Sequence, residues 1–283
     1  MAMDEKGLGK RLQLARQGAG LTQQQLCQKA NLSFSTLTKI ERGAIKSPSI
    51  FTVQAIAIAL GSSIDKLIGN SPAPDRKFLK TKSGVSFVYF DVNGCLVHFY
   101  QRAFARLATA SGVPSDLVET AFWHYNDEVC RGTISMQDFN AYIAEKLNID
   151  SVDWMKYYME MVEPITEMQA LLKQASEHYK IGLLTNIMPG QLRTMTTSGV
   201  LPDLSYDVII DSSEVGAIKP ETQVYEIAQE RAGCPPEEIL LIDDTRANIV
   251  AAEKQGWKVL WFDDARLEEA VDRVREVLEP ANK

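Results

Sequence analysis

The sequence predicts a multidomain protein, in which an all-α domain over residues 1–70 is followed by an α/β domain with a parallel sheet over residues 83–283. A chain of 283 residues is long enough for two domains, and 45% hydrophobic with 24% charged residues is typical of a folded soluble protein. Apolar residues recur at helical spacing in the first part, whereas short apolar runs alternate with helical stretches in the second. The first part has nine Lys and Arg against four Asp and Glu, a net charge of +5, and the second has a net charge of −15. This contrast indicates that the two parts have different partners.

Residues 71–82 are predicted to link the two domains. The stretch Gly69–Asp75 holds two prolines and several turn formers, so no helix continues through it. Four basic residues and one acidic residue extend the positive charge of the first domain into the linker.

Apolar stripes predict the helices of the first domain. They are Leu8, Leu12 and Ala15; Leu37 and Ile40; Val53, Ile56, Ala57 and Leu60; and Ile64, Leu67 and Ile68. Thr22 is placed to cap one helix, and Ser33 to cap the next after a short turn at residues 30–32. Gly43 then ends the second helix. Such a pair is a helix-turn-helix, whose second helix enters the major groove of DNA.

This pair closely resembles the XRE family of phage-repressor-like DNA-binding domains, over residues 7–69. The resemblance implies that Gln23 clamps a phosphate and that the recognition helix presents an exposed face to base edges. The implied DNA-binding residues are Gln23, Ser33, Phe34, Ser35, Thr36, Lys39, Arg42 and Lys46. It also implies a double-stranded DNA operator as partner, bound by a homodimer on a near-palindromic site. The positive charge fits phosphate neutralisation. A helix-turn-helix used only for protein contacts is the alternative.

Five apolar runs of strand length predict the sheet of the second domain. They are Val85–Phe90, Ile181–Leu184, Val208–Ile210, Ile239–Ile242 and Val259–Phe262. Because helical stretches separate these runs, the sheet is expected to be parallel. Residues 100–175 contain helical patterns only, and they are predicted to be an insertion after the first strand.

Polar residues follow several of these strands, at the sheet edge where α/β proteins bind ligands. Asp91 follows the first strand and precedes a glycine turn. The other members occur in order along the chain: Thr185 and Asn186, then Lys219, then Asp243, Asp244 and Asn248. Together they supply a nucleophilic carboxylate, phosphate donors, a cation and carboxylates for a metal.

This order of motifs resembles the haloacid dehalogenase superfamily, over residues 83–265, with its Rossmannoid core and a helical cap at about residues 100–175. The closest likeness is to its phosphatase-type branch. The resemblance implies that Asp91 is a nucleophile that forms an aspartyl-phosphate and that Thr185 and Asn186 hold phosphate oxygens. It also implies that Lys219 neutralises the charge of the nucleophile and of the phosphoryl group. It implies a metal site made of Asp91, Asn93, Asp243, Asp244 and Asn248. Oxygen ligands beside a phosphate favour Mg²⁺, and a chain with three histidines offers little for zinc.

Asn93 departs from the pattern of that branch. Phosphatase members usually carry a second aspartate at this position, which protonates the leaving group, and an amide cannot do so. Three readings follow: a domain that senses a phosphorylated small molecule with little or no turnover, a working Mg²⁺-dependent phosphatase, or a structural relic. The first is our expectation, within a DNA-binding transcriptional regulator. The second keeps the helix-turn-helix as a means of localising an enzyme on DNA.

Several residues of the second domain have two interpretations each. His98, His124, Tyr125 and Arg131 are candidates for the cap's substrate pocket or ordinary surface and core groups, whereas Trp123 and Trp154 are expected to pack. Residues 130–135 are predicted to form a turn between two cap helices. The apolar stripe within residues 263–279 predicts a helix that docks on the domain or forms a dimer contact.

The remaining features indicate a cytoplasmic protein with no membrane partner. The first six residues contain no apolar secretion signal, and no apolar run approaches the roughly 20 residues that a bilayer requires. The four cysteines show no C-x-x-C pair, so we expect reduced thiols.

Overall fold

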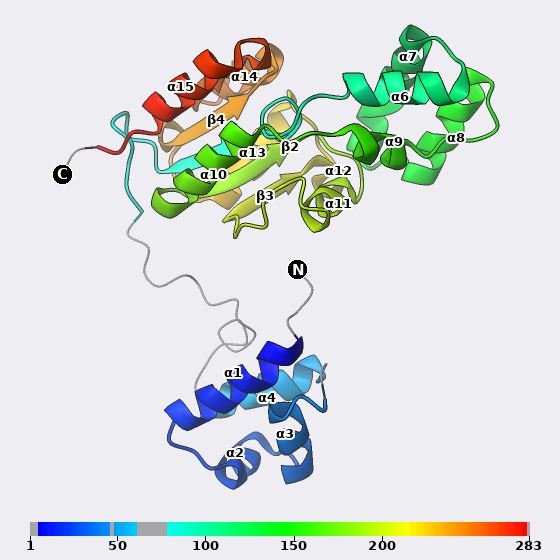
Figure 1. The fold of residues 1–283 in the computed structure, drawn as a ribbon. Coiled ribbons are helices and arrows are strands. Elements are labelled where there is room, and N and C mark those ends of the chain that lie inside the picture. The colour runs from blue at the N-terminus through cyan, green and yellow to red at the C-terminus, as the bar shows by residue number, and fades with distance from the viewer. Residues whose placement is uncertain (1–4, 46–47, 61–77, 282–283) are drawn as a thin grey trace. The chain divides into compact units, whose positions relative to one another are not determined.

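The computed structural model describes residues 5–45, 48–60 and 78–281, which belong to two compact units, Met1–Arg76 and Lys77–Lys283. The described helices of the first unit are α1 (Glu5–Gly18), α2 (Gln23–Ala30), α3 (Phe34–Glu41) and α4 (Ile50–Ala59), drawn in blue in Figure 1. The predicted stripe at residues 64–68 and the predicted DNA contact Lys46 lie outside the described residues.

The predicted helix pair is confirmed as α2 and α3. The side chain of Thr22 caps α2 within a full capping box, and the side chain of Ser33 caps α3. Between them Asn31 ends α2 in the left-handed region at φ 50°. Gly43 follows α3 at φ 74°, a conformation that favours glycine. These local signals set the angle between the two helices.

A small core holds the first unit together, and α1 closes it. The core residues are Leu8, Leu12, Leu26, Cys27, Ala30, Leu37, Ile40, Ile56 and Ala57. A Cβ at Gly9 would stand 2.2 Å from the carbonyl oxygen of Ile40, so α1 and α3 meet at a point where only glycine fits. Beside this contact, Arg16 forms a two-point ion pair with buried Glu41, with distances of 2.7 Å and 3.0 Å. The pair ties α1 to α3.

The second unit contains a sheet of five parallel strands in the order β3-β2-β1-β4-β5, which confirms the predicted parallel sheet. The strands are β1 (Phe87–Phe90), β2 (Lys180–Thr185), β3 (Val208–Asp211), β4 (Ile239–Asp243) and β5 (Lys258–Trp261). From β1 the chain builds one side of the sheet through β2 and β3, then crosses to β4 and β5. The carboxyl ends of β1 and β4 therefore meet where the strand order reverses, the usual ligand position in such sheets.

Helices cover both faces of this sheet. Val88 and Phe90 of β1 face a core that includes α10 (Thr166–His178) and α15 (Leu267–Val277). Phe87 and Tyr89, which alternate with them, face a second core that includes α13 (Thr222–Ala232) and α14 (Arg246–Lys254). Two shorter helices of this unit are α11 (Gln191–Thr197), whose Leu192 and Met195 belong to the first core, and α12 (Ser212–Val215).

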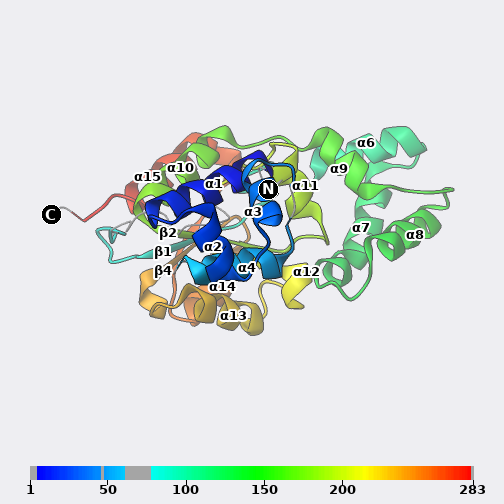
Figure 2. The ribbon, with the colours of Figure 1, turned by 90° about the horizontal axis from the view of Figure 1, so that it is seen from below.

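The predicted insertion is a cap of four helices at one end of the sheet (Figures 1 and 2). They are α6 (Gln101–Ser111), α7 (Ser115–Cys130), α8 (Met136–Leu147) and α9 (Trp154–Met161). The turn predicted at residues 130–135 lies between α7 and α8. The predicted end of the cap near residue 175 is wrong. An antiparallel bridge between Val97 and Pro164 returns the chain to the core, and α10 then packs on β2 and α15.

Two further predictions, for the linker and for the tail helix, concern the second unit. Residues 78–82, predicted to be linker, lie against this unit, because Lys82 donates its backbone N–H to Glu279 and Thr81 bridges Pro280. The predicted tail helix is α15, and it docks on the domain by burying Val271 and Val274. No described helix is both long and apolar enough to cross a membrane, and all four cysteines are free thiols.

Candidate functional site

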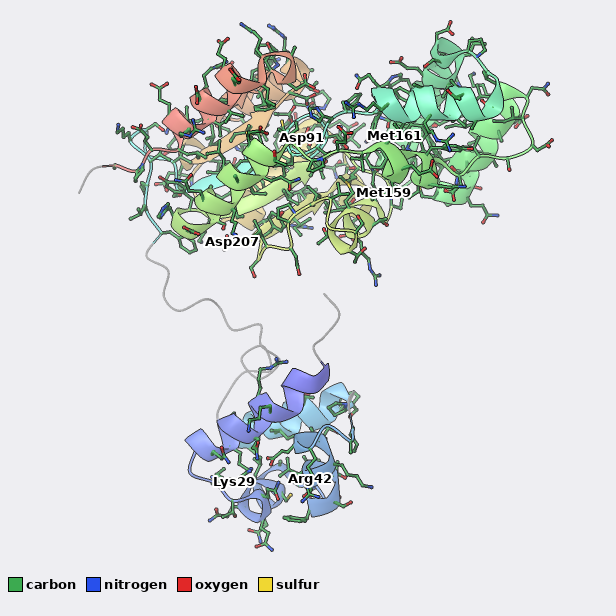
Figure 3. All side chains as sticks on the ribbon, viewed as in Figure 1. Lys29, Arg42, Asp91, Met159, Met161 and Asp207 are labelled. Atoms are coloured by element: carbon green, nitrogen blue, oxygen red, sulfur yellow. The ribbon has the colours of Figure 1, made fainter. Side chains whose placement is uncertain are left out.

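The predicted site residues of the second unit converge at the carboxyl edge of the sheet. Asp91 follows β1, Thr185 ends β2 and Asp243 ends β4, so the parallel register brings their side chains to one edge. Lys219 reaches the same place from the segment before α13. Figure 3 labels Asp91 where the sheet faces the cap.

A buried lysine joins the two central carboxylates. The Nζ atom of Lys219 lies 3.0 Å from Oδ1 of Asp91 and 2.5 Å from Oδ2 of Asp243. Burial alone would lower the pKa of Lys219, but the charges of Asp243 and Asp91 raise this pKa above its ordinary value. The lysine therefore stays cationic and balances part of the negative charge at the site.

Asp243 is fixed from several sides. Its Oδ1 accepts hydrogen bonds from the backbone N–H of Thr245 at 2.8 Å and from Nδ2 of Asn248 at 3.0 Å. Nδ2 of Asn248 also approaches Oδ2 at 3.1 Å. Asn248 thus directs its amide nitrogen, a donor, toward Asp243, and this contact orients the carboxylate.

Carboxylate oxygens gather closely enough to hold a metal ion. Asp91, Asp243 and Asp244 each offer an oxygen atom, and these atoms all lie within 4.8 Å of one another. Burial raises the pKa of Asp91 to about 6, against the opposing effect of Lys219, and burial with the neighbouring carboxylates raises that of Asp244 to about 7. A divalent cation bound to these carboxylates would offset the cost of their burial and their mutual repulsion. The all-oxygen donor set suits Mg²⁺.

Gly94 lets the chain turn closely past this carboxylate cluster. Its φ is 85°, and a Cβ there would stand 2.2 Å from Oδ2 of Asp244. Any larger residue would therefore displace Asp244, so the glycine turn after Asp91 has a geometric reason.

Thr185 and Asn186, both predicted to hold phosphate oxygens, differ in their surroundings. Among the described residues, the buried hydroxyl of Thr185 has no hydrogen-bond partner. A buried hydroxyl normally finds one, so this atom is suited to an oxyanion beside Lys219. Asn186 instead uses both amide atoms on the main chain of Lys219, at 2.8 Å and 2.7 Å. It positions the lysine segment.

Asn93 is clamped between two tyrosines. Its Nδ2 donates to the hydroxyl of Tyr100 at 3.0 Å, and its Oδ1 accepts from the hydroxyl of Tyr158 at 2.9 Å. Burial raises the pKa of both tyrosines above the ordinary value, so both hydroxyls stay neutral. Tyr158 comes from the cap and Asn93 from the core, so the contact also holds the cap near the carboxyl edge of the sheet.

A cavity of about 300 Å³ opens above this edge. Asp91, Lys219 and Asp244 lie on its core side. Its cap side includes Phe99, Tyr100, Trp123, Asn126 and Asp127. The cavity is thus lined on one side by the predicted phosphate-site residues and on the other by residues of the cap.

The cap residues that line this cavity differ from those predicted. His98, His124, Tyr125 and Arg131 are absent from the described lining. Arg131 instead pairs with Glu221 of the core at 2.6 Å.

The outcome for the cap tryptophans is divided. Trp154 is fully buried, as expected for packing. Trp123, also expected to pack, is 44% exposed and faces the cavity. The helical phase of α7 carried the signal for this difference, because Phe122 and Trp123 are neighbours and only one of them can face the core.

The predicted DNA-binding residues lie on and beside α3. Ser33, Phe34, Ser35, Lys39 and Arg42 are exposed, and Phe34 remains 50% exposed although it is apolar. Figure 3 labels Arg42, which follows α3 in the chain.

Three of the predicted DNA contacts form hydrogen bonds inside the unit. The hydroxyls of Ser33 and Thr36 bond to each other at 2.7 Å, within the helix cap. Gln23 donates its amide to Glu41 at 2.7 Å, which connects α2 to the ion pair of α1 and α3. The exposed basic groups Lys39 and Arg42 are thus the direct candidates for phosphate contact.

Comparisons with known proteins divide along the same boundary. A family model described as Helix-turn-helix matches residues 12–67, and one described as Haloacid dehalogenase-like hydrolase matches residues 90–262. The immunity repressor protein of Bacillus phage phi105 is 44% identical over 62 residues, which are 22% of this chain and 42% of the repressor.

Relatives of the second unit include phosphate-handling enzymes. Pyrophosphatase PpaX of Bacillus velezensis is 22% identical over 194 residues, 63% of this chain and 83% of that protein. Pyrimidine 5'-nucleotidase YjjG of Escherichia coli is 26% identical over 125 residues, 42% of this chain and 55% of the nucleotidase. The chain thus spans less than two thirds of the repressor and of the nucleotidase.

Solved structures share the fold of the second unit. A HAD family enzyme from Bacteroides thetaiotaomicron, in complex with magnesium and inorganic phosphate, aligns with a TM-score of 0.56 at 19% identity, covering 64% of this chain and 95% of that one. L-2-haloacid dehalogenase from Xanthobacter autotrophicus aligns with a TM-score of 0.51 at 20% identity, covering 69% and 85%.

Proposed function

The chain belongs to the haloacid dehalogenase-like hydrolases and carries an XRE-like helix-turn-helix domain before the hydrolase region, and we propose that it is a transcriptional regulator that senses a phosphorylated small molecule. In this proposal the α/β unit binds the phosphate, the helical unit binds an operator, and turnover is weak or absent. The observation that carries it is the amide of Asn93, hydrogen-bonded at both ends, in the cavity that Asp91 and Lys219 also line.

Phosphate binding is supported by charge and by unused hydrogen-bonding capacity. Lys219 is buried and cationic, and the hydroxyl of Thr185 is unpartnered among the described residues. Asp91, Asp243 and Asp244 would hold Mg²⁺, which would neutralise charge on the phosphate oxygens. A phosphate monoester therefore fits this edge better than an uncharged ligand.

Weak turnover follows from the proton that Asn93 cannot supply. Attack by Asp91 on phosphorus breaks the bond to the ester oxygen, and that oxygen must gain a proton as it leaves. Losing a general acid typically costs about 10²- to 10⁴-fold in rate, or roughly 3 to 5 kcal/mol. Tyr100 and Tyr158 do not replace it readily, since burial raises their pKa values and both hydroxyls bond to the amide.

The second candidate function is an active phosphatase that the helix-turn-helix localises on DNA. In this candidate Asp91 would be the nucleophile, with Nζ of Lys219 3.0 Å from its Oδ1, and several relatives of this region are named as phosphatases or nucleotidases. An alcohol with a low pKa leaves without being protonated. Such an enzyme would therefore hydrolyse phosphate esters of acidic alcohols faster than esters of ordinary alcohols.

For a ligand to regulate DNA binding, it must bind the DNA-competent and DNA-incompetent states with different affinities. The direct test uses the full chain, Mg²⁺ and an operator oligonucleotide selected from a random pool. Operator affinity is titrated against a panel of phosphate esters, and each ester is then assayed for release of inorganic phosphate. An Asp91→Asn variant is the test of the nucleophile, and exposed Glu253→Gln on α14 is the matched control.

Each outcome separates the two candidates. An ester that shifts operator affinity and is recovered unhydrolysed supports sensing. Phosphate release that Asp91→Asn abolishes, with operator affinity unchanged by every ester, contradicts sensing and favours the localised enzyme.

A further inference from the structure

The cap side of the cavity carries an aromatic wall that the phosphate chemistry does not use. Trp123 is 44% exposed, and the ring of Phe99 lies parallel to it, 5.9 Å away at an interplanar angle of 12°. Glu119 accepts a hydrogen bond from the indole nitrogen at 3.3 Å, which fixes the orientation of the tryptophan ring. Large aromatic faces left open in a cavity favour a flat partner that stacks on them.

A carboxylate stands beside this wall. Asp127 is exposed in the cavity lining, and Asn126 donates its amide to Oδ1 of Asp127 at 3.3 Å. Of the described lining residues, Lys219 alone is basic, and it lies between two carboxylates on the core side. The nearest cap cation by sequence, Arg131, is paired with Glu221. A second anionic group on the ligand would therefore face Asp127 without a free countercharge in this lining.

The cavity also limits size. Its volume of about 300 Å³ is at the small end of the range for ligand sites, enough for a phosphate and one ring system.

We propose that the cap selects a phosphate monoester whose alcohol half is a single flat aromatic ring, neutral or positively charged. This inference rests on the proposed function, because it names the class of molecule that the same phosphate site accepts. It disfavours ligands with a second phosphate or a carboxylate at the far end. The flat ring stacks on Trp123, and a cationic group on the ring meets Asp127.

The test is a calorimetric titration of the full chain with Mg²⁺ in an Asp91→Asn background, which lacks the nucleophile. The probes are inorganic phosphate, phenyl phosphate, cyclohexyl phosphate, para-(aminomethyl)phenyl phosphate and para-carboxyphenyl phosphate. We expect phenyl phosphate to bind about tenfold more tightly than its cyclohexyl analogue. The aminomethyl compound should bind a further ~3-fold more tightly, and the carboxyl compound ~3-fold more weakly, than phenyl phosphate.

Matched variants assign these preferences to their residues. Trp123→Leu should abolish the preference for the flat ring, and Asp127→Asn should abolish the preference for the cation. Tyr142 on α8 and Glu128 on α7 are exposed and lie outside the described lining. The control variants Tyr142→Leu and Glu128→Gln should therefore keep the preferences for the flat ring and for the cation.

Equal binding of phenyl and cyclohexyl phosphate, or a ring preference that survives Trp123→Leu, overturns the inference while binding of inorganic phosphate leaves the proposed function standing. Failure of inorganic phosphate and of every ester to bind overturns both.

Discussion

Tyr158 of the cap donates its hydroxyl proton to the side-chain carbonyl of Asn93 in the core across 2.9 Å. Because the amide nitrogen of Asn93 donates to Tyr100 at 3.0 Å, both ends of the amide are fixed. The position where the resemblance to the phosphatase-type branch implies an acid is thus occupied by a neutral group whose hydrogen bonds suit an amide. The structure accommodates Asn93 with partners on both sides, and this supports a stable role without proton transfer.

Replacing Asn93 by Asp is expected to create or raise phosphatase turnover. The carboxyl would supply the missing acid, but hydrogen bonds from the tyrosine hydroxyls would favour its ionised form and hold its pKa low. We therefore expect kcat to rise about 10²-fold for esters with poor leaving groups, which is the low end of the rate gain that a general acid gives. Steady-state assays of inorganic phosphate release with Mg²⁺ measure it.

An additional Tyr158→Phe change should raise the activity of the Asn93→Asp variant further, because one donor to the ionised carboxylate is removed. Asn93→Gln is the control for size and should gain nothing. An Asn93→Asp protein no more active than the parent would contradict the view that the absent acid limits turnover.

Removing the charge of Lys219 is expected to destabilise the α/β unit. A Lys219→Met variant leaves Asp91 and Asp243 buried without their cation, which should cost about 3 to 5 kcal/mol of unfolding free energy at pH 8. Asp91, whose pKa is already raised by burial, would then take up a proton in the folded state, so the deficit should shrink toward pH 5. All four tryptophans lie beyond residue 122, so fluorescence during urea unfolding reports this unit alone.

Exposed Lys173→Met on α10 is the control and should change the unfolding free energy by less than ~0.5 kcal/mol. A deficit for Lys219→Met that is equal at pH 5 and pH 8 would show that lost packing, and not unpaired charge, is responsible.

Binding of Mg²⁺ is expected to tighten as the pH rises. The pKa of Asp91 is raised to about 6 and that of Asp244 to about 7, so Mg²⁺ must displace protons near pH 6 and few near pH 8. From these values the apparent dissociation constant should fall roughly 20-fold between pH 6 and pH 8. Calorimetric titration with Mg²⁺ measures it, and Asp244→Asn should flatten the dependence.

In the metal-free protein, the raised pKa values of Asp91 and Asp244 have the opposite effect on stability, which should fall as the pH rises. Between about pH 4 and pH 7 the folded state binds more protons at these carboxyls than the unfolded state, so unfolding free energy should fall as the pH rises. Added Mg²⁺ should remove much of this fall. A metal-free protein whose stability from this site rises across that range would contradict the raised pKa values.

The sheet and the helix pair were predictable because their signals are local. Strand-length apolar runs preceded Asp91, Thr185 and Asp243 at the carboxyl edge of the sheet, and the side chains of Thr22 and Ser33 marked the helix starts. The helical phase of α7 could have shown that Trp123 is exposed, but its place in the cavity wall depends on how the cap lies over the core, which the sequence does not show. The end of the cap was also missed, because α10 has the same amphipathic pattern whether it covers a sheet or other helices.

The ion pair of Arg16 and Glu41 is expected to govern the stability of the helix-turn-helix unit. Both side chains are buried, and Gln23 and the carbonyl of Leu21 add hydrogen bonds to the pair. Arg16→Met leaves Glu41 as an uncompensated charge and should cost about 3 to 5 kcal/mol. This unit contains no tryptophan, so its unfolding is measured as the far-ultraviolet circular dichroism transition that the tryptophan fluorescence of the second unit does not share, and exposed Lys10→Met is the control.

The double variant Arg16→Met with Glu41→Leu should recover most of that stability, because it removes the buried charge along with its partner. A double variant no more stable than Arg16→Met would mean that the geometry of the pair, including the bond to Gln23, is what holds α1 to α3.

Lys39 is expected to contribute to DNA affinity through phosphate contact. It is exposed in the last turn of α3, whereas Gln23 is bound to Glu41 within the unit. Lys39→Gln should weaken binding to a selected operator and to unrelated DNA by similar factors, and should reduce the slope of log affinity against log salt concentration by about 1. Fluorescence anisotropy at several salt concentrations measures both.

Lys29→Gln on α2 is the control for net charge, since it makes the same change on the preceding helix. Loss of operator affinity with unchanged binding to unrelated DNA would assign Lys39 to a base edge, and equal effects of the two variants would show that only the overall charge of the unit matters.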